Sequence, residues 1–207
     1  MNKSRISKNW IRKQHKDVFV RKSKVFGYRS RAIYKIEEIN NKFRIFNNNS
    51  FVVDLGAAPG SWSQYLKKII TKGKILSIDL KEIEKIDGVY FLQGDFTDIK
   101  NQEKIREYFG KKLDVVISDM AVNTTGNKEL DSMLTGELCI EAMNFAKKLL
   151  KPNGFFISKF FMGSISKEII TIAKKNFQLI NIFKPKASRS DSKENFIIGK
   201  FLKKYDK

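Results

Sequence analysis

Cysteine and histidine are almost missing from this chain of 207 residues, in which Cys139 and His15 are single examples of their types. One cysteine cannot form a disulfide within the chain, which fits a reducing compartment. Two such side chains are also too few for a structural zinc site, which takes four cysteine or histidine ligands. We therefore expect no metal, and we place Cys139 in the core.

Long hydrophobic runs are missing as well. No apolar stretch approaches the ~18 residues of a membrane helix, and no signal-peptide core follows Met1. Proline is rare, and no repeat or low-complexity linker divides the chain. A chain of this length buries roughly 70% of its unfolded surface as one domain. We expect a single domain over residues 1–207, without membrane attachment and monomeric in the simplest case.

Acidic residues are scarce, since 22 carboxylates face 41 lysines and arginines and leave a formal charge of +19. The excess is greatest in residues 1–31, where Asp17 is the single acid and aromatic residues lie between the cations. Such a segment is typical of phosphate contact combined with base stacking. We predict that a basic helical segment (about 1–45) contacts nucleic acid, with Arg29 and Arg31 on phosphates and His15 facing solvent or RNA. A solvated helix face or a mitochondrial targeting segment is the alternative.

The rest of the sequence alternates short apolar runs with longer amphipathic stretches, as in a parallel sheet with connecting helices. Helices are expected at about 8–25, 30–44, 60–71, 98–109, 131–150 and 165–175. Strands are expected at about 51–54, 74–79, 89–92, 113–118, 153–159, 177–183 and 195–202. No helix separates the last two strands, which predicts an antiparallel hairpin at one sheet edge. The fold class is therefore α/β, a mostly parallel sheet with helices on both faces.

The segment 51–64, FVVDLGAAPGSWSQ, contains an apolar run, an acid, a turn of small residues and a helix start. Such a turn opens a nucleotide-sized site at the end of a first strand, because small residues let a ligand approach the backbone. Pro59 occupies a place where the dinucleotide fingerprint needs glycine. Asp54 leads the turn, and a carboxylate beside the ligand suits cationic S-adenosylmethionine better than a diphosphate. NAD binding or a plain turn is the alternative.

Acidic residues also end the following strands, at Asp79, Asp95 and Asp119. The carboxyl ends of parallel strands meet at the crevice where α/β proteins bind ligands. Asp79 follows Gly60 by about 20 residues, the separation at which an acid accepts hydrogen bonds from ribose hydroxyls. Asp95 would be within reach of an adenine edge. Each acid taken singly could instead be a helix cap or a loop residue.

Lys159 ends the apolar run 154–158 and precedes two phenylalanines. Lysines are rarely buried without a partner or a task. Apolar surroundings penalise the charged form, which would make this lysine a usable base. A lysine extending to solvent at the strand end is the alternative. Trp62, just after the glycine turn, fits either the core or the surroundings of a cofactor.

Together these segments resemble the FtsJ/RrmJ (RlmE) family of ribosomal RNA 2′-O-methyltransferases. The resemblance runs from about Ser4 to Phe201. It rests on YRSRAIYK (28–35) with Glu38-Ile39, DLGAAPGSWSQ (54–64), FLQGDF (91–96), SDMA (118–121) with Asn123 and Gly126, Lys159, and KPKASRSDSKE (184–194). It implies the class I S-adenosylmethionine-dependent methyltransferase fold, which is Rossmann-like and has a seven-stranded sheet with one antiparallel strand.

The resemblance also implies site residues. The family's Lys-Asp-Lys-Glu tetrad falls on Lys35, Asp119, Lys159 and Glu194. Its S-adenosylmethionine contacts fall on Gly60, Trp62, Asp79, Asp95 and Asp119. In this scheme Lys159 takes the proton of a ribose 2′-hydroxyl as general base, and no metal takes part. The chain differs from the family pattern at Val122, at Ser61 and in the loop 160–165.

The implied substrate is a ribose, that of a uridine, in large-subunit ribosomal RNA, and the implied compartment is the cytoplasm, or the mitochondrion for a eukaryotic source. One alternative keeps the chemistry but acts on tRNA. Another is a ribosome assembly factor that binds RNA without turnover, which would need neither a tetrad nor a cofactor turn. An NAD-dependent oxidoreductase is disfavoured by Pro59 and by the basic N-terminal segment.

Overall fold

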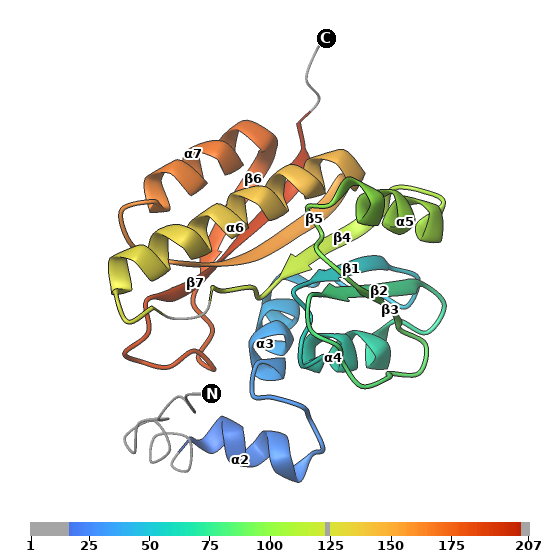
Figure 1. Cartoon of the computed structure of the whole chain (residues 1–207), viewed down its shortest axis with the longest axis horizontal. Coiled ribbons are helices and arrows are strands. Elements are labelled where there is room, and N and C mark those ends of the chain that lie inside the picture. Colours follow the sequence, from blue (N-terminus) through green and yellow to red (C-terminus); the bar gives the residue numbers. More distant parts are fainter. Residues whose placement is uncertain (1–16, 123–124, 204–207) are drawn as a thin grey trace, which may run out of the picture.

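The computed structural model describes residues 17–122 and 125–203, and Figure 1 shows a central sheet between two layers of helices. The sheet has seven strands in the order β3-β2-β1-β4-β5-β7-β6. These are β1 (Phe51–Leu55), β2 (Lys74–Asp79), β3 (Tyr90–Gln93), β4 (Leu113–Ser118), β5 (Leu150–Phe161), β6 (Phe177–Phe183) and β7 (Glu194–Leu202). β7 pairs antiparallel with β5 and β6, while the other strand pairs are parallel. The predicted fold class and the terminal hairpin are both confirmed.

Helices cover both faces of this sheet. They are α2 (Val18–Val25), α3 (Ile33–Phe43), α4 (Ser61–Ile69), α5 (Ile99–Phe109), α6 (Lys128–Leu149) and α7 (Ser166–Asn176). Side chains alternate along each strand, so Val52 packs in the core formed with α3 and α4, and Val53 packs in the core formed with α5, α6 and α7. Cys139 of α6 is 1% exposed, which confirms its predicted core position.

The predicted N-terminal basic segment divides into two parts. α3 is a layer of the fold, because Ile33, Ile36 and Ile39 repeat at helical spacing and are all buried. α2 lies beyond α3, away from the sheet (Figure 1). Core packing therefore fixes α3, whereas α2 lies outside the core (Figure 1).

Element boundaries differ from the predicted ones where caps decide them. α2 begins at Val18 because the Asp17 carboxylate accepts the N–H groups of Phe19 and Val20; residues 8–16 of the predicted helix, with His15, lie outside the described part of the chain. α6 begins at Lys128 rather than near 131, because Asn127 caps it. None of the helices described here is long and apolar enough to cross a membrane.

Candidate active site

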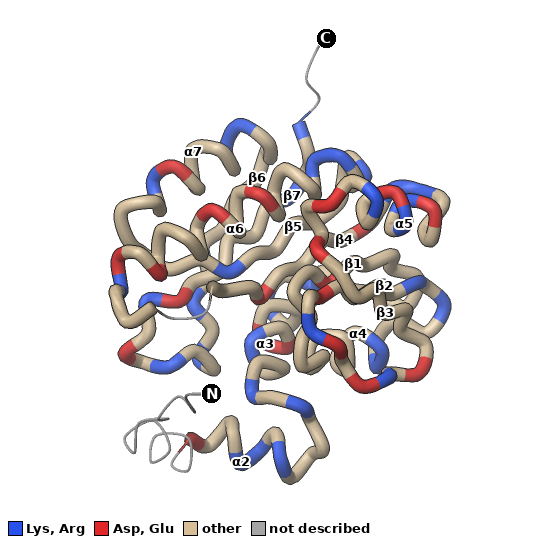
Figure 2. Tube along the Cα trace, in the orientation of Figure 1, with Lys and Arg blue, Asp and Glu red and all other residues tan. Residues whose placement is uncertain are grey.

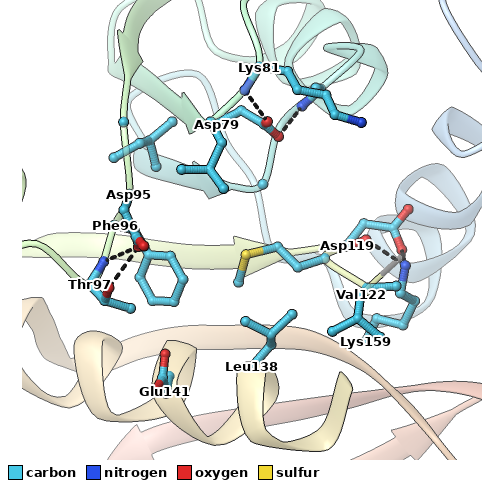
Figure 3. Close-up of a pocket in the computed structure, with 17 residues that line it drawn as sticks. Asp79, Lys81, Asp95, Phe96, Thr97, Asp119, Val122, Leu138, Glu141 and Lys159 are labelled. Carbon is cyan, nitrogen blue, oxygen red and sulfur yellow. Dashed lines mark hydrogen bonds and ion pairs between the residues drawn. The ribbon is translucent and has the colours of Figure 1, made fainter. Parts of the chain in front are cut away.

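A cavity of about 610 Å³ opens at the carboxyl ends of the parallel strands. Gly56 follows β1, Asp79 ends β2, Asp95 follows β3 and Asp119 follows β4, and all four line the cavity. Figure 3 shows Asp79 and Asp95 on one side, with Asp119 and Lys159 on the other. A cavity of this volume suits a small-molecule ligand. The acids predicted from strand ends are thus brought together at one edge of the sheet.

Backbone hydrogen bonds hold the two acids on the cavity wall. Asp79 accepts the N–H of Ala58 through Oδ2 at 2.9 Å and the N–H of Lys81 through Oδ1 at 2.8 Å. Asp95 accepts both the N–H and the hydroxyl of Thr97, at 2.8 and 2.7 Å. Carboxylate oxygens have more than one lone pair, so each acid can still accept a hydrogen bond from a ligand hydroxyl or amine.

The glycine turn needs its small residue because Met120 lies against it. Gly56 has a φ of 70°, and a Cβ built there would lie 2.0 Å from the Met120 side chain. The N–H groups of Gly56 and Ala57 both donate to the carbonyl of Ile78, which ties the turn to the end of β2. Gly56 therefore forms part of one cavity wall without a side chain of its own.

Asp54 does not face the cavity, which corrects the prediction of a carboxylate beside the ligand at this position. Its side chain is 1% exposed and accepts the Ser63 hydroxyl at 2.7 Å. The Ser63 and Ser77 hydroxyls lie 2.6 Å apart. Burial raises the pKa of Asp54 to about 7, and the hydrogen bond from Ser63 offsets only part of this effect. Through the Ser63 hydrogen bond, Asp54 connects β1 to α4 on either side of the turn.

Gly60 and Trp62, predicted to contact the cofactor, are not among the residues that line the cavity. Gly60 has a φ of 98°, and a Cβ there would lie 2.5 Å from Nη1 of Arg29, which crosses over it. Trp62 is 2% exposed, donates its indole N–H to Ala32 at 2.8 Å and packs on Phe196 with ring centroids 5.7 Å apart. Trp62 is therefore a core residue.

The four predicted tetrad residues meet beside the cavity. The Lys159 ammonium donates to the Asp119 carbonyl at 2.5 Å and lies 3.0 Å from Oδ1 of the same residue. The Lys35 ammonium lies 3.5 Å from Asp119 Oδ2 and 2.7 Å from Glu194 Oε2. Glu194 reaches this edge because β7 is antiparallel to β5, which places its first residue opposite Phe161. Positive and negative groups therefore alternate from Glu194 to Lys159.

Mutual charge stabilisation dominates in this cluster. Burial raises the pKa of Asp119, but the ammonium groups of Lys159 and Lys35 outweigh it and hold that pKa below its usual value. Burial lowers the pKa of Lys35, but the carboxylates of Asp119 and Glu194 outweigh it and raise that pKa. Lys159 is 8% exposed, so it does not extend to solvent.

Arg29 and Arg31, predicted to contact phosphates, are bound within the fold instead. Arg31 donates to the carboxylate of Asp17 and to the carbonyl of Ala187. Arg29 donates to the carbonyls of Pro59 and Lys85, at 3.1 and 3.2 Å. Both guanidinium groups connect the start of α3 to distant loops, so the prediction of two free phosphate contacts is wrong. Sequence alone could not show this, because every partner is remote along the chain.

Several residues of the cavity wall were missed by sequence reasoning. Leu138 and Glu141 of α6 and Lys81 after β2 all line the cavity (Figure 3). Leu138 and Glu141 are three residues apart, the spacing that places both on one helix face. Among residues 17–122 and 125–203, no group of three or more histidine, cysteine or acidic side chains is arranged to hold a metal ion.

Comparisons with known proteins show the family of the chain. The family model of the FtsJ-like methyltransferases matches residues 28–201. The ribosomal RNA large subunit methyltransferase E of Pelagibacter ubique (strain HTCC1062) is 55% identical over 98% of this chain and 100% of its own length. A solved ribosomal RNA methyltransferase from Plasmodium falciparum has a TM-score of 0.76 at 33% identity, covering 84% of this chain and 98% of that one. Human methyltransferase-like protein 13, solved with SAH, shares the fold with a TM-score of 0.60 at 14% identity, over 81% of each chain. Because the family model spans residues 28–201 and the Pelagibacter relative is 55% identical over nearly the whole length, the chain belongs to the FtsJ-like methyltransferase family.

Proposed function

We propose that this protein transfers a methyl group from S-adenosylmethionine to the 2′-hydroxyl of a ribose, that of a uridine, in large-subunit ribosomal RNA. The observation that carries the proposal is the buried Lys159 ammonium, which lines the cavity and contacts Asp119. The name of the 55% identical relative, which matches this chain over almost its whole length, supports the RNA substrate. The proposed site of action is the cytoplasm.

The cavity residues fit S-adenosylmethionine. Asp79 would accept the ribose hydroxyls of the cofactor and Asp95 its adenine amine, because both carboxylates are held at the wall with lone pairs unused. Asp119 would face the positively charged methionine end. Gly60 would contribute to the cofactor site by shaping the turn after β1, and Trp62 by packing on Phe196. When bound, S-adenosylmethionine supplies an electrophilic methyl group that already carries its leaving group.

Lys159 is the better general base of the two lysines. Lys35 contacts two carboxylates, whereas Lys159 contacts one and lines the cavity. The two lysines share the Asp119 carboxylate, with Lys35 at 3.5 Å from Oδ2 and Lys159 at 3.0 Å from Oδ1. Neutral Lys159 would take the proton of the 2′-hydroxyl at Nζ, a role typically worth ~10²–10⁴-fold in rate. Lys35 and Glu194 would orient the ribose, and the fixed alignment adds to the rate.

The basic N-terminal segment would hold the RNA. Figure 2 shows lysine and arginine along α2, where the single acid is Asp17 at its start. Arg21, Lys22 and Lys24 are exposed, and Phe26 next to them is 65% exposed. Exposed cations beside an exposed aromatic ring suit phosphate contact and base stacking. In this proposal α2 takes over the phosphate contacts that sequence reasoning gave to Arg29 and Arg31.

Transfer of labelled methyl from S-adenosylmethionine to purified large ribosomal subunits that lack 2′-O-methyl groups tests the proposal, with tRNA assayed alongside. We expect label on a ribose of the subunit RNA and loss of that label with Lys159→Ala. Label on tRNA alone would keep the chemistry and replace the substrate. A protein that binds S-adenosylmethionine but labels neither RNA would instead be a non-catalytic assembly factor.

A further inference from the structure

Ser188 contacts the last member of the tetrad from the side away from Lys35. It lies in segment 184–193, which joins β6 to β7, and is 7% exposed. Its hydroxyl donates to Oε1 of Glu194 at 2.6 Å, while Oε2 of the same carboxylate accepts from Lys35 at 2.7 Å. The two carboxylate oxygens are thus held by two different partners, which leaves the group one orientation.

The backbone that carries Ser188 is fixed to α3. Both oxygens of Glu38 accept N–H groups from the segment, those of Lys186 at 2.7 Å and Ala187 at 2.8 Å. Arg31 donates to the carbonyl of Ala187. Lys35 and Glu38 are three residues apart on α3 and so project from one helix face. The same face of one helix therefore contacts Glu194 directly and sets the place from which Ser188 reaches it.

We propose that Ser188 is a positioning residue for methyl transfer, acting through Glu194 on the Lys35–Asp119–Lys159 cluster; this rests on the proposed function. Without the hydroxyl, Oε1 of Glu194 keeps no donor in a buried place, and the carboxylate turns away from Lys35. Lys35 then moves toward Asp119, its other carboxylate partner at 3.5 Å, and competes with Lys159 for it. The base and the ribose-orienting groups both lose alignment.

Ser188→Ala in the full-length chain tests this inference, with Ser190→Ala as the matched control because Ser190 is exposed in the same segment. We expect kcat on large ribosomal subunits to fall about 10- to 100-fold, the loss that a misplacement near 1 Å produces. The KM for S-adenosylmethionine and the melting temperature should stay near those of the control, because the cofactor cavity does not include Ser188. Parallel losses of stability and cofactor binding would show a structural role and overturn the inference.

A double-mutant cycle with Glu194→Ala decides whether the effect passes through Glu194. Single-turnover assays followed for hours can still measure the Glu194→Ala rate if that variant loses ~10⁴-fold in methyl transfer. Ser188→Ala should cost less than about twofold in the Glu194→Ala background if the hydroxyl acts through that carboxylate. An equal loss in both backgrounds, or no loss in the wild-type background, would refute the positioning role. Full activity of Glu194→Ala would instead overturn the tetrad of the proposed function.

Discussion

Asp54 and Asp119 show how neighbouring carboxylates acquire opposite properties. Asp54 lies within the central strand β1 and is buried, whereas Asp119 directly follows the neighbouring strand β4 and lines the cavity. Burial raises the pKa of Asp54 to about 7, because the Ser63 hydroxyl compensates only part of its lost hydration. Two ammonium groups reverse the same penalty at Asp119 and lower its pKa. Asp119 therefore keeps its charge for the reaction, and Asp54 exchanges a proton near neutral pH.

Asp54→Asn should flatten the pH dependence of stability. The folded wild type keeps a proton up to about pH 7 that the unfolded chain releases near 3.8, so its stability falls as pH rises between these values. A pKa change of this size corresponds to a loss of roughly 4 kcal/mol in the free energy of unfolding as pH rises from 3.8 to about 7. The asparagine variant should not show this loss. Urea unfolding at pH 4 and pH 8 measures this difference in the free energy of unfolding, with exposed Asp87→Asn as control. Equal slopes for wild type and Asp54→Asn would contradict the assignment.

Lys159→Ala should separate catalysis from cofactor binding. The ammonium contacts Asp119 rather than Asp79 or Asp95, so the acids proposed to bind adenosine remain in place. We expect turnover to fall by at least ~10²-fold, the size typical of a general base, with the affinity for S-adenosylmethionine nearly unchanged by calorimetry. Lys151→Ala on the same strand, paired with Asp114, is the control. Equal loss of binding and turnover would mean that Lys159 is structural.

At the scale of elements, α3 links the core to the site. Its buried isoleucines pack on the sheet, Lys35 contacts Glu194 at the start of β7, and Glu38 contacts the segment before β7. The helix was predicted from its periodicity, and its place in the fold was not. Periodicity reports that a face is apolar but not which surface covers it, so α3 was assigned with α2 to a basic segment that contacts RNA.

Glu38→Ala should loosen segment 184–193 while α3 stays folded. Two backbone N–H groups, those of Lys186 and Ala187, lose their acceptor. Hydrogen exchange at these two amides should speed up, and methyl transfer should slow, because Ser188 and Glu194 are no longer held against Lys35. The matched control is Glu37→Ala, because Glu37 precedes Glu38 on the same helix and its side chain is exposed. Unchanged exchange at both amides would show that the hydrogen bond from Arg31 to the Ala187 carbonyl holds the segment without Glu38.

At the scale of the whole molecule, the excess positive charge divides into bound and displayed parts. Arg29 and Arg31 connect elements, whereas Lys22 and Lys24 are exposed on α2. This helix lies beyond α3, away from the sheet (Figures 1 and 2). A net charge of +19 predicts attraction to RNA but does not say which cations make it. Arg29 and Arg31 are hydrogen-bonded to carbonyl and carboxylate groups of the protein itself, so we do not count them among the cations that attract RNA.

Charge reversal should therefore have different effects in the two places. The double variant Lys22→Glu/Lys24→Glu should weaken binding to ribosomal RNA and reduce the salt slope by about two, with the melting temperature nearly unchanged. Arg31→Glu should lower the melting temperature, because it faces Asp17 and the Ala187 carbonyl. Lys100→Glu/Lys104→Glu on α5, at the opposite side of the molecule in Figure 1, is the control for net charge. Equal salt slopes for both double variants would rule out α2 as the RNA contact.

The sequence by itself determined the alternation of strands and helices, the turn after β1 and the acids at strand ends, because each follows from local spacing and residue type. Resemblance to a family located the tetrad residues, whose charges are far apart along the chain. Only the tertiary structure decided that Asp54 and Trp62 are interior, that Arg29 and Arg31 hold loops, and that Ser188 and Glu38 secure Glu194. These outcomes depend on hydrogen bonds between segments that only folding brings together. Those of Glu194 exist because the antiparallel β7 places its first residue at the edge where the parallel strands end.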